Sequence, residues 1–315
     1  MKALIKQADD ESAALAAELL DKGELVAFPT ETVYGLGADA ANDLAVASIF
    51  ETKGRPQFNP LIAHIADLAW IEKFAEMTPV AKKLAENFLP GPLTMVMKRS
   101  ENCPISHLVC AGLDTVGVRF PIHAGAQKML KAFGRPVAAP SANISGTVSP
   151  TTAEHVAQGL GDKIPLILDG GACSVGVEST IVDVTTDAPA LLRAGGLAVE
   201  DIEDVLKKPL RRPEADPNAP RSPGQMLSHY APRLPVRLNA EQPEAGEAFL
   251  AFGAADNATL NLSPTEDLRE AAAHLFAYMR LLDDKKYTGI AVMPIPTRGL
   301  GLAINDRLKR AAYPH

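Results

Sequence analysis

Cysteine is scarce in this chain of 315 residues, with only Cys103, Cys110 and Cys173 present. Their spacing fits no zinc motif, and an odd number of thiols cannot all pair as disulfides. We therefore expect a reducing compartment, and the cytoplasm is the simplest one. Long apolar runs are also missing. No stretch of about 18 or more apolar residues occurs, so no membrane span is expected.

The first residues do not have the composition of a targeting segment. Residues 1–7 mix apolar and basic side chains, and the chain turns acidic at 9–11. A secretory signal would need a continuous apolar stretch in this region. We therefore expect no signal peptide and no membrane partner.

Several catalytic signatures are missing as well. The chain has no GxxxxGK[ST] loop, which argues against a P-loop enzyme. Gly35-Leu36-Gly37 lacks the third glycine of a dinucleotide-binding fingerprint. No G-x-S-x-G elbow indicates a serine hydrolase. No cluster of histidine and cysteine indicates a metal ion held by protein side chains.

The charge balance argues against a nonspecific nucleic-acid binder. The formal net charge is −7, and residues 1–208 hold 18 Lys and Arg against 26 Asp and Glu. Residues 209–315 are nearly neutral, with 13 against 12. A protein that binds nucleic acid through its overall field would be basic, so direct contact with tRNA has no support from charge. A local basic cleft is still compatible with these numbers. The residues that could form it are Lys53, Arg55, Arg119 and Arg193.

The length suggests two domains, and a proline-rich stretch separates two patterned regions. Residues 1–208 alternate predicted strands and helices, which indicates an α/β domain. Residues 209–235 contain seven prolines, a density that excludes regular structure and predicts a semi-extended linker. Residues 236–315 predict a second, smaller α/β domain. The expected helices are 12–22, 42–53, 79–89, 124–133, 151–158, 199–206, 266–283 and 302–312. The expected strands are 24–28, 61–65, 93–98, 116–120, 136–139, 165–168, 179–184, 190–193, 236–238, 248–252, 259–262 and 289–293.

Two cations stand two residues apart in Lys53-Gly-Arg55-Pro56. An arginine presents a planar fork and a lysine a point charge, and both suit phosphate oxygens. The alternative is a solvated helix C-terminus, where cations also stabilise the helix dipole. Taken alone, the motif leaves the two readings about even. The rigid Gly-Arg-Pro context and the nearby Asn59-Pro60 favour the phosphate site.

Polar residues also gather in two short motifs. Ser141 and Asn143 lie two apart, so they point to the same side of an extended backbone, among small residues that permit close approach of a ligand. A polar turn after a strand is the common alternative. Ser179-Thr180 places two hydroxyls at the entrance of a strand. Hydroxyl pairing between strands is the alternative there.

Two charged or titratable residues lie inside apolar strands. Arg119 follows Thr115-Val-Gly-Val, and such a position is costly for an arginine unless it meets an anion. That anion could be a ligand or a structural carboxylate. His64, in Leu61-Ile-Ala-His-Ile, is by itself more typical of a hydrogen-bonded core histidine than of a site residue.

Several motifs, in order along the chain, resemble the YrdC-like threonylcarbamoyl-AMP synthase family. They begin with Phe28-Pro-Thr-Glu-Thr-Val-Tyr-Gly-Leu-Gly and continue through Lys53-Gly-Arg-Pro, Ser141-Ala-Asn, Gly176-Val-Glu-Ser-Thr and Leu192-Arg-Ala-Gly. Ser222-Pro-Gly, His229-Tyr-Ala-Pro and Gly299-Leu-Gly-Leu-Ala-Ile-Asn-Asp-Arg-Leu resemble the family's long, two-domain branch. Residues 225–228 depart from that branch, because its linkers usually carry a basic residue there. The resemblance implies an α/β fold. A YrdC-like catalytic domain with a twisted mixed sheet would be joined by the linker to a Rossmann-like C-terminal α/β domain.

The resemblance also implies roles for individual residues. Lys53 and Arg55 would act in catalysis, and Tyr230 would reach over the cleft from the linker. Arg119 would bind the carboxylate of L-threonine. The implied threonine site consists of Thr32, His64, Arg119, Ala139 and Ser179. The implied ATP site consists of Lys53, Arg55, Asn59, Thr115, Ser141, Asn143, Ser149, Arg193 and Tyr230.

The family activity implied is the condensation of L-threonine, bicarbonate and ATP to threonylcarbamoyl-AMP and pyrophosphate. Mg²⁺ would enter with ATP, without ligands from protein side chains. The implied recipient of the product is a tRNA threonylcarbamoyl transferase complex. Two rival hypotheses are an RNA-binding or ribosome-assembly module that uses the same concave surface, and a carbamoyl-transferring maturation factor. The acidic first 208 residues argue against the first rival. The second would carry acylphosphatase and zinc-finger regions, which this chain does not show.

Overall fold

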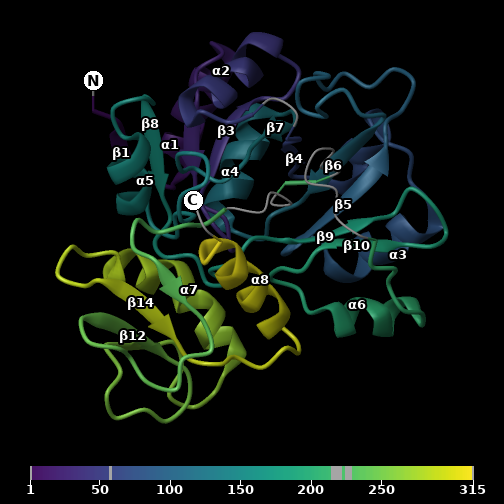
Figure 1. Cartoon of the computed structure of the whole chain (residues 1–315). Coiled ribbons are helices and arrows are strands. Elements are labelled where there is room, and N and C mark those ends of the chain that lie inside the picture. Colours follow the sequence, from purple (N-terminus) through teal and green to yellow (C-terminus); the bar gives the residue numbers. More distant parts are fainter. Residues whose placement is uncertain (1, 57–58, 214–221, 224–228, 314–315) are drawn as a thin grey trace.

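The computed structural model describes residues 2–56, 59–213, 222–223 and 229–313. The larger domain is built on a ten-stranded sheet, shown in the upper part of Figure 1, in the order β1-β8-β2-β3-β7-β4-β6-β5-β9-β10. The sheet is mixed as predicted, because β4 and β6 are parallel whereas β5 and β6 are antiparallel. Its strands are β1 (Leu4–Gln7), β2 (Val26–Phe28), β3 (Gly35–Asp39), β4 (Ile62–His64), β5 (Leu93–Lys98), β6 (Thr115–Arg119), β7 (Val137–Ala138), β8 (Leu166–Asp169), β9 (Thr180–Asp183) and β10 (Ala190–Arg193).

Helices cover both faces of this sheet because its strands are apolar on both sides. In β2, Val26 and Phe28 pack with α1 and α4 on one face, whereas Ala27 joins the cluster on the other. This alternation is the two-residue period of a strand. The cluster that contains Ala27 also includes apolar residues of α2, α3, α5 and α6. The helices of this domain are α1 (Asp10–Asp21), α2 (Asp43–Lys53), the 3₁₀ helix η1 (Leu68–Lys73), α3 (Pro79–Phe88), α4 (Ala124–Phe133), α5 (Ala153–Leu160) and α6 (Val199–Leu206).

The ends of α2 place the two cations of the Lys53-Gly-Arg motif. The Asn42 side chain accepts hydrogen bonds from the backbone of Leu44 and Ala45 and so caps the start of the helix expected at 42–53. The helix ends at Lys53, and Gly54 turns the chain with φ of 60°, a conformation that suits glycine. Lys53 therefore belongs to the last helical turn, whereas Arg55 starts a new direction.

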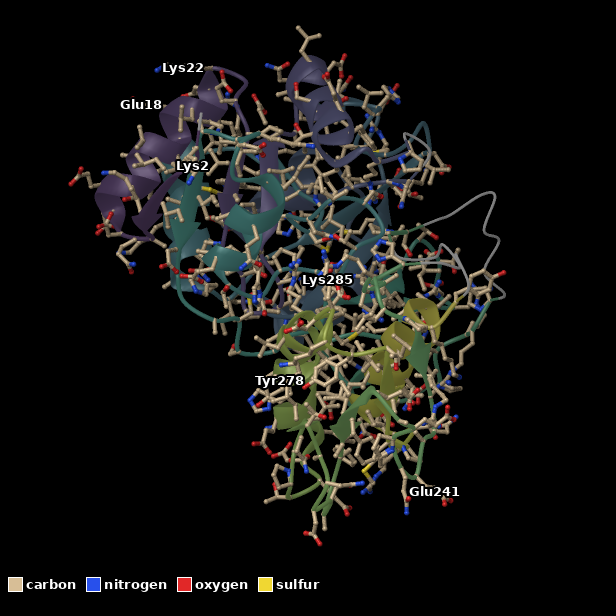
Figure 2. The ribbon with its side chains drawn as sticks, turned by 60° about the vertical axis from the view of Figure 1, so that its left-hand side comes forward. Lys2, Glu18, Lys22, Glu241, Tyr278 and Lys285 are labelled. Carbon is tan, nitrogen blue, oxygen red and sulfur yellow. The ribbon has the colours of Figure 1, made fainter. Side chains whose placement is uncertain are left out.

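The smaller domain carries a parallel sheet in the order β11-β14-β12-β13. Its strands are β11 (Val236–Arg237), β12 (Glu247–Ala251), β13 (Leu260–Asn261) and β14 (Gly289–Val292), and its helices are α7 (Leu268–Leu282) and α8 (Gly301–Ala311). Figure 1 shows α8 on the side of this domain that meets the larger one. In Figure 2, Glu18 of α1 and Lys22, which follows that helix, mark one end of the molecule, and Glu241 marks the other. The described residues between α6 and β11 form no helix or named strand, as the proline content predicts.

The two domains share one apolar cluster. Val33, Val148 and Val177 of the larger domain pack with residues of α7 and α8. Gly176 lies so close to α7 that a Cβ there would stand 2.3 Å from the carbonyl oxygen of Ala272. A tight interface therefore fixes the segment that leads into β9 against the C-terminal domain.

Three elements were not expected from the sequence. They are β1, β3 and η1. No strand was expected at 35–39, but Gly35 and Gly37 pair with β2 across the sheet. Glycine has a low strand propensity, but pairing on both sides by β2 and β7 overrides it. None of the helices in the described ranges has both the length and the apolar character needed to cross a membrane.

Candidate active site

A cavity of about 50 Å³ lies where several strands of the large sheet end. Its wall is formed by residues from the loop before β3, from β4, β6 and β10, and from the segments that follow β7 and precede β9. Pro223, His229 and Tyr230 of the linker also line it. The residues expected at the site that line this cavity are Arg55, His64, Arg119, Ala139, Ser141, Ser179, Arg193 and Tyr230.

The other expected site residues lie behind this wall or beside it. Thr115 lines an adjoining small cavity, which shares Ile62 and Pro223 with the first. The hydroxyl of Thr32 is 2.9 Å from that of Thr30, which does face the cavity. The remaining members are not in the cavity wall in this conformation. They are Lys53, Asn59, Asn143 and Ser149.

Lys53 holds the loop that carries Ser141. Its Nζ donates to the carbonyl oxygen of Ser141 at 2.6 Å and also to that of Asn143. The Asn143 amide in turn donates to the carbonyl oxygens of Ile144 and Thr147. Burial, with the nearby charge of Arg55, lowers the pKa of Lys53 well below its usual value. Lys53 thus ties α2 to the segment after β7 from behind the cavity wall.

Arg55 and Arg193 donate hydrogen bonds to backbone carbonyl oxygens. Arg55 donates to Pro60 O at 3.0 Å, and Arg193 donates to Ser179 O at 2.9 Å and Pro223 O at 3.3 Å. Both side chains are 8% exposed. Burial lowers the pKa of Arg55 to about 10 and also lowers that of Arg193. These guanidinium groups form a positive wall. Glu178 partly compensates the charge of Arg193, whereas the bonds of Arg55 are to carbonyl dipoles, which compensate a charge poorly.

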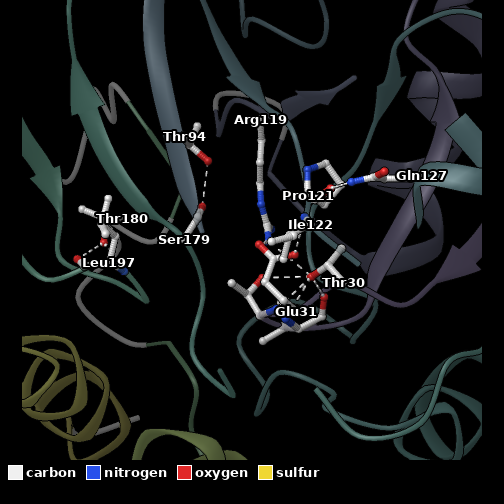
Figure 3. A network of polar contacts seen from close by, with 12 residues as sticks. Thr30, Glu31, Thr94, Arg119, Pro121, Ile122, Gln127, Ser179, Thr180 and Leu197 are labelled. Carbon is white, nitrogen blue, oxygen red and sulfur yellow. Dashed lines mark hydrogen bonds and ion pairs between the residues drawn. The ribbon is translucent and has the colours of Figure 1, made fainter. Parts of the chain in front are cut away.

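Arg119 and His64 lie side by side because β4 and β6 are parallel and these two residues are paired in register. Arg119 donates from Nη2 to Oε1 of Glu31 at 2.6 Å, and both side chains are buried (Figure 3). The second Glu31 oxygen accepts the backbone N–H of Ile122 at 3.2 Å. In this conformation the partner of Arg119 is therefore the structural carboxylate, one of the two alternatives that the sequence left open. Arg119 Nε has no hydrogen-bond partner among the described residues.

His64 is neutral. Burial and the charge of Arg119 lower its pKa to about 3. Its Nδ1 lies 3.1 Å from the carbonyl oxygen of Ile62, so a backbone contact orients the ring. His64 is a core histidine with a backbone partner, and it also faces the cavity.

The hydroxyl pairing considered for the strand entrance is present. Ser179 Oγ lies 2.7 Å from Thr94 Oγ1, and Thr180 donates to the carbonyl oxygen of Leu197 at 2.6 Å (Figure 3). Ser179 nevertheless lines the cavity, and Arg193 Nη2 approaches its hydroxyl at 3.3 Å. The Ser179 hydroxyl therefore contacts Thr94 within the fold, and Ser179 also lies in the cavity wall.

Two acidic residues of the site were missed from the sequence. Glu31 holds Arg119, and Glu178 lies in the cavity wall. Glu178 stands between Val177 and Ser179, and a buried carboxylate at a strand entrance requires a partner just as Arg119 does. Its place among apolar residues and hydroxyls is the signal that could have identified it. The linker departure at 225–228 lies outside the described residues.

Two family models cover most of the chain. Residues 18–195 match the family model described as "Telomere recombination", whose name combines Sua5, YciO and YrdC. Residues 197–313 match the family model described as "Threonylcarbamoyl-AMP synthase, C-terminal domain". The threonylcarbamoyl-AMP synthase of Pyrococcus abyssi is 42% identical over 318 residues, which covers 95% of this chain and 93% of that protein. This chain belongs to the threonylcarbamoyl-AMP synthase family. Proteins of that name make an adenylate, so the chain is an enzyme of the nucleotidyltransferase type.

The fold supports the same family. The crystal structure of P. abyssi Sua5 complexed with L-threonine superposes with a TM-score of 0.90 at 39% identity and covers 99% of this chain and 97% of that one. A shorter relative from Mycobacterium tuberculosis, named provisionally as a threonylcarbamoyl-AMP synthase, is 37% identical over 192 residues. That match spans 87% of the mycobacterial protein but 61% of this chain. The threonylcarbamoyl-AMP synthase family thus includes members of different length.

Proposed function

We propose that this enzyme condenses L-threonine, bicarbonate and ATP to L-threonylcarbamoyladenylate and pyrophosphate. The observation that carries the proposal is the set of arginines around one cavity. Arg55, Arg119 and Arg193 all line it, and each is less than 10% exposed. Such a concentration of buried positive charge requires anionic ligands, and this reaction brings together a polyphosphate and a carboxylate.

The threonine half of the site would lie at Arg119. Its guanidinium would take the amino-acid carboxylate through Nε and the face that Glu31 leaves free, and Glu31 would keep the fork oriented. Uncharged groups that can recognise the amine and the hydroxyl surround this position. They are Thr30 with Thr32 behind it, His64, Ala139 and Ser179.

The ATP half would lie at Arg55, Ser141 and Arg193. Lys53 and Asn143 would shape this half from behind the wall, and Asn59, Thr115 and Ser149 would join it after a change of conformation. Burial lowers the pKa of both Arg55 and Lys53, because removal from water disfavours their charged forms. A bound polyphosphate would supply the negative charge that stabilises these charged forms. The positive wall is therefore preorganised for phosphates before they arrive.

The chemistry needs no protein nucleophile. The threonine amine forms a C–N bond with the carbon of CO₂, one C–O π bond becomes a lone pair on oxygen, and the amine releases a proton to give a carbamate. With bicarbonate, the C–OH bond breaks instead and the hydroxyl leaves as water with the amine proton. A carbamate oxygen then bonds to the α-phosphorus of ATP, the bond from that phosphorus to the bridging oxygen of the β-phosphate breaks, and pyrophosphate leaves. The protein holds two anions close together and stabilises charge on the leaving group. Well-oriented reactants can lower the barrier by about 7–11 kcal/mol, and fixed donors add electrostatic stabilisation.

Mg²⁺ would enter as its complex with ATP. Among the described residues that line the cavity, Glu178 is the one acid, and its two oxygens already accept from Ser149 and Arg307. The described chain contains no group of three or more His, Cys, Asp or Glu that could hold a metal ion. Phosphate oxygens would therefore hold the metal, which would neutralise part of the charge on the pyrophosphate.

The linker would act as a lid. Its residues Pro223, His229 and Tyr230 line the cavity, and Arg193 donates to the carbonyl oxygen of Pro223. These residues narrow the cavity to about 50 Å³ in this conformation. Movement of the linker would widen it for ATP. Closing again would exclude water from a carbamate and an anhydride that both hydrolyse.

The product would pass to a tRNA threonylcarbamoyl transferase complex in the cytoplasm. A labile mixed anhydride needs a nearby acceptor, and its threonylcarbamoyl group suits transfer to the amine of an adenosine in tRNA. The net charge of −7 gives direct tRNA binding no support, so we assign that contact to the partner complex. The three free cysteines agree with a reducing compartment.

Pyrophosphate release from ATP tests this proposal. We expect release only when L-threonine and bicarbonate are both present, with omission of either one reducing the rate to background. An RNA-binding or ribosome-assembly module would release none under any combination. ATP hydrolysis that is indifferent to threonine would contradict the proposed reaction.

A further inference from the structure

One buried ion pair joins the C-terminal domain to the wall of the cavity. Arg307 of α8 is fully buried, and its Nε donates to Oε2 of Glu178 at 2.9 Å. The other oxygen of Glu178 accepts the hydroxyl of Ser149 at 2.6 Å. Arg307 Nη1 donates to Ala194 O at 2.8 Å. The guanidinium thus crosses the domain boundary and bonds to two separate segments of the catalytic domain.

The same guanidinium also contacts the linker. Its central carbon lies 5.4 Å from the centre of the Tyr230 ring, within the range of a cation–π contact. The Tyr230 ring also stacks on Phe276 of α7, with 5.4 Å between the ring centres. Tyr230 therefore contacts both helices of the C-terminal domain while it lines the cavity.

Glu178 links its ion pair with Arg307 to the other residues of the active site. Its backbone carbonyl accepts the N–H of Gly196 at 2.9 Å, and the next residue, Ser179, offers its carbonyl oxygen to Arg193. A shift of Glu178 would therefore move Ser179, Arg193 and the hydroxyl of Ser149 together. These residues belong to both halves of the proposed substrate site.

The charge of Glu178 depends on its neighbours. Burial alone would raise the pKa of this carboxyl, but Arg307, Arg193 and the Ser149 hydroxyl lower it to about 2. The groups that face it are Ser149 from the loop before α5, Arg193 from β10, Arg307 from α8, and His229 and Tyr230 from the linker. Asp306 of α8 accepts a hydrogen bond from Arg307. Burial keeps both linker groups uncharged, because it lowers the pKa of His229 to about 3 and raises that of Tyr230. Without Arg307, Arg193 would be the one cation left among these groups.

We propose that Arg307 is a positioning residue of the active site, supplied by the C-terminal domain to hold the Glu178 carboxylate, and with it Ser149, Ser179 and Arg193, in the geometry that binds ATP. The proposal rests on the proposed function and gives the C-terminal domain a role in it. The shorter mycobacterial relative matches only 61% of this chain. We therefore connect the contact between Arg307 and Glu178 with the presence of the C-terminal domain and not with the chemistry of the reaction.

The experiment compares Arg307→Met, Arg307→Lys, Glu178→Gln and Arg307→Met with Glu178→Gln, all in the full-length chain. Arg237→Met is the matched control, because Arg237 forms an ion pair with Glu247 within the C-terminal domain at 2.5 Å. Threonine-dependent pyrophosphate release is measured against ATP concentration from pH 5.5 to 9. Wild-type activity tests the proposed function, and only the differences among variants test Arg307.

We expect Arg307→Met to lose roughly 10- to 100-fold in kcat/KM for ATP, as contacting residues couple on this scale, and the control to stay near wild type. The pH profile of Arg307→Met should show an acidic limb, a loss of activity at low pH that wild type lacks. Burial without Arg307 raises the pKa of Glu178, so activity is lost as pH falls through the raised value. The double variant should lack this limb, and Arg307→Lys should restore part of the rate. An unchanged pH profile, or equal losses in Arg237→Met, would overturn the proposal.

Unfolding free energy against pH supplies a readout that does not depend on activity. In wild type, the depressed pKa of Glu178 contributes stability that is present above its unfolded value and lost as pH falls toward 2. In Arg307→Met the raised pKa reverses the sign, so this variant should gain stability relative to the double variant as pH falls from 8 to 5. If Arg307→Met does not fold, Arg307→Lys and Glu178→Gln carry both comparisons. Parallel stability curves for Arg307→Met and the double variant would contradict the role of Arg307 in holding this charge.

Discussion

Arg55→Ala should remove activity while leaving the fold as stable as before. Arg55 lines the cavity, and it donates to the backbone carbonyl oxygens of Asn59 and Pro60. If it holds phosphates, its loss removes a charge-assisted contact that strengthens as pyrophosphate leaves. Removing such a contact costs roughly 2–4 kcal/mol, or about 30- to 1000-fold in rate.

The stability side of this prediction follows from the pKa of Arg55. Burial lowers it from the usual arginine value to about 10, and each unit corresponds to about 1.36 kcal/mol. The charged form is thus disfavoured in the folded protein by on the order of 3 kcal/mol. This cost is fully present below the lowered pKa of about 10 and fades as pH rises from there toward the usual arginine value. Alanine removes it but loses the bond to Pro60 O, worth about 1 kcal/mol, and some packing, so the two effects nearly offset.

The assay pairs pyrophosphate release with thermal unfolding at pH 7.5, and Arg135→Ala is the control. Arg135 lies in the same domain, is away from the cavity wall and donates to Asp39 and Asp21. Arg135→Ala should lower stability slightly and leave activity intact, whereas Arg55→Ala should remove activity and leave stability unchanged. Arg55→Lys should also fail, because a point charge does not replace a fork. Full activity of Arg55→Ala with an unchanged ATP KM would refute the reasoning, as would a fall in stability that accounts for the lost rate.

Three further predictions concern the substrates and the lid. Valine should react far more slowly than threonine, because it leaves a buried hydrogen-bonding group unpaired, whereas serine should lose only about 1–3 kcal/mol of methyl contact; equal rates for valine and threonine would exclude a pocket that reads the hydroxyl. Tyr230→Ala should lower the product formed per ATP consumed by admitting water, and unchanged coupling would make the linker a simple tether. Because the pKa of His64 is about 3, the threonine KM should show no inflection near pH 6.5, and an inflection that His64→Asn abolishes would contradict this.

Local signals in the sequence predicted most elements of the fold. Asn42 marks the start of α2, and the prolines at Pro79 and Pro90 bracket α3. β3 was missed because its glycines are typical of turns, and pairing with β2 and with the remote β7 makes it a strand. The cap of α5 also required the structure, where the Thr152 side chain accepts the N–H of His155.

The cations of the site were predictable, whereas their acidic partners were not. Lys53, Arg55 and Arg119 stand out as charges in short motifs or apolar strands. Glu31 is 88 residues from Arg119 and Glu178 is 129 from Arg307, so no spacing rule connects either pair. The structure also showed that Lys53 and Asn143 support the wall from behind instead of lining it. Pairings between remote segments depend on the packed sheet and on the domain interface.

Mass spectrometry of the product made from ¹³C-bicarbonate tests the central claim most directly. The full-length enzyme would be incubated with ATP, Mg²⁺, L-threonine and the labelled bicarbonate, and product and pyrophosphate would be measured together. The account predicts a threonylcarbamoyl adenylate that carries one ¹³C atom, with one pyrophosphate released per molecule and none when threonine is omitted. Release of pyrophosphate without the labelled adenylate, or an adenylate without the label, would contradict it.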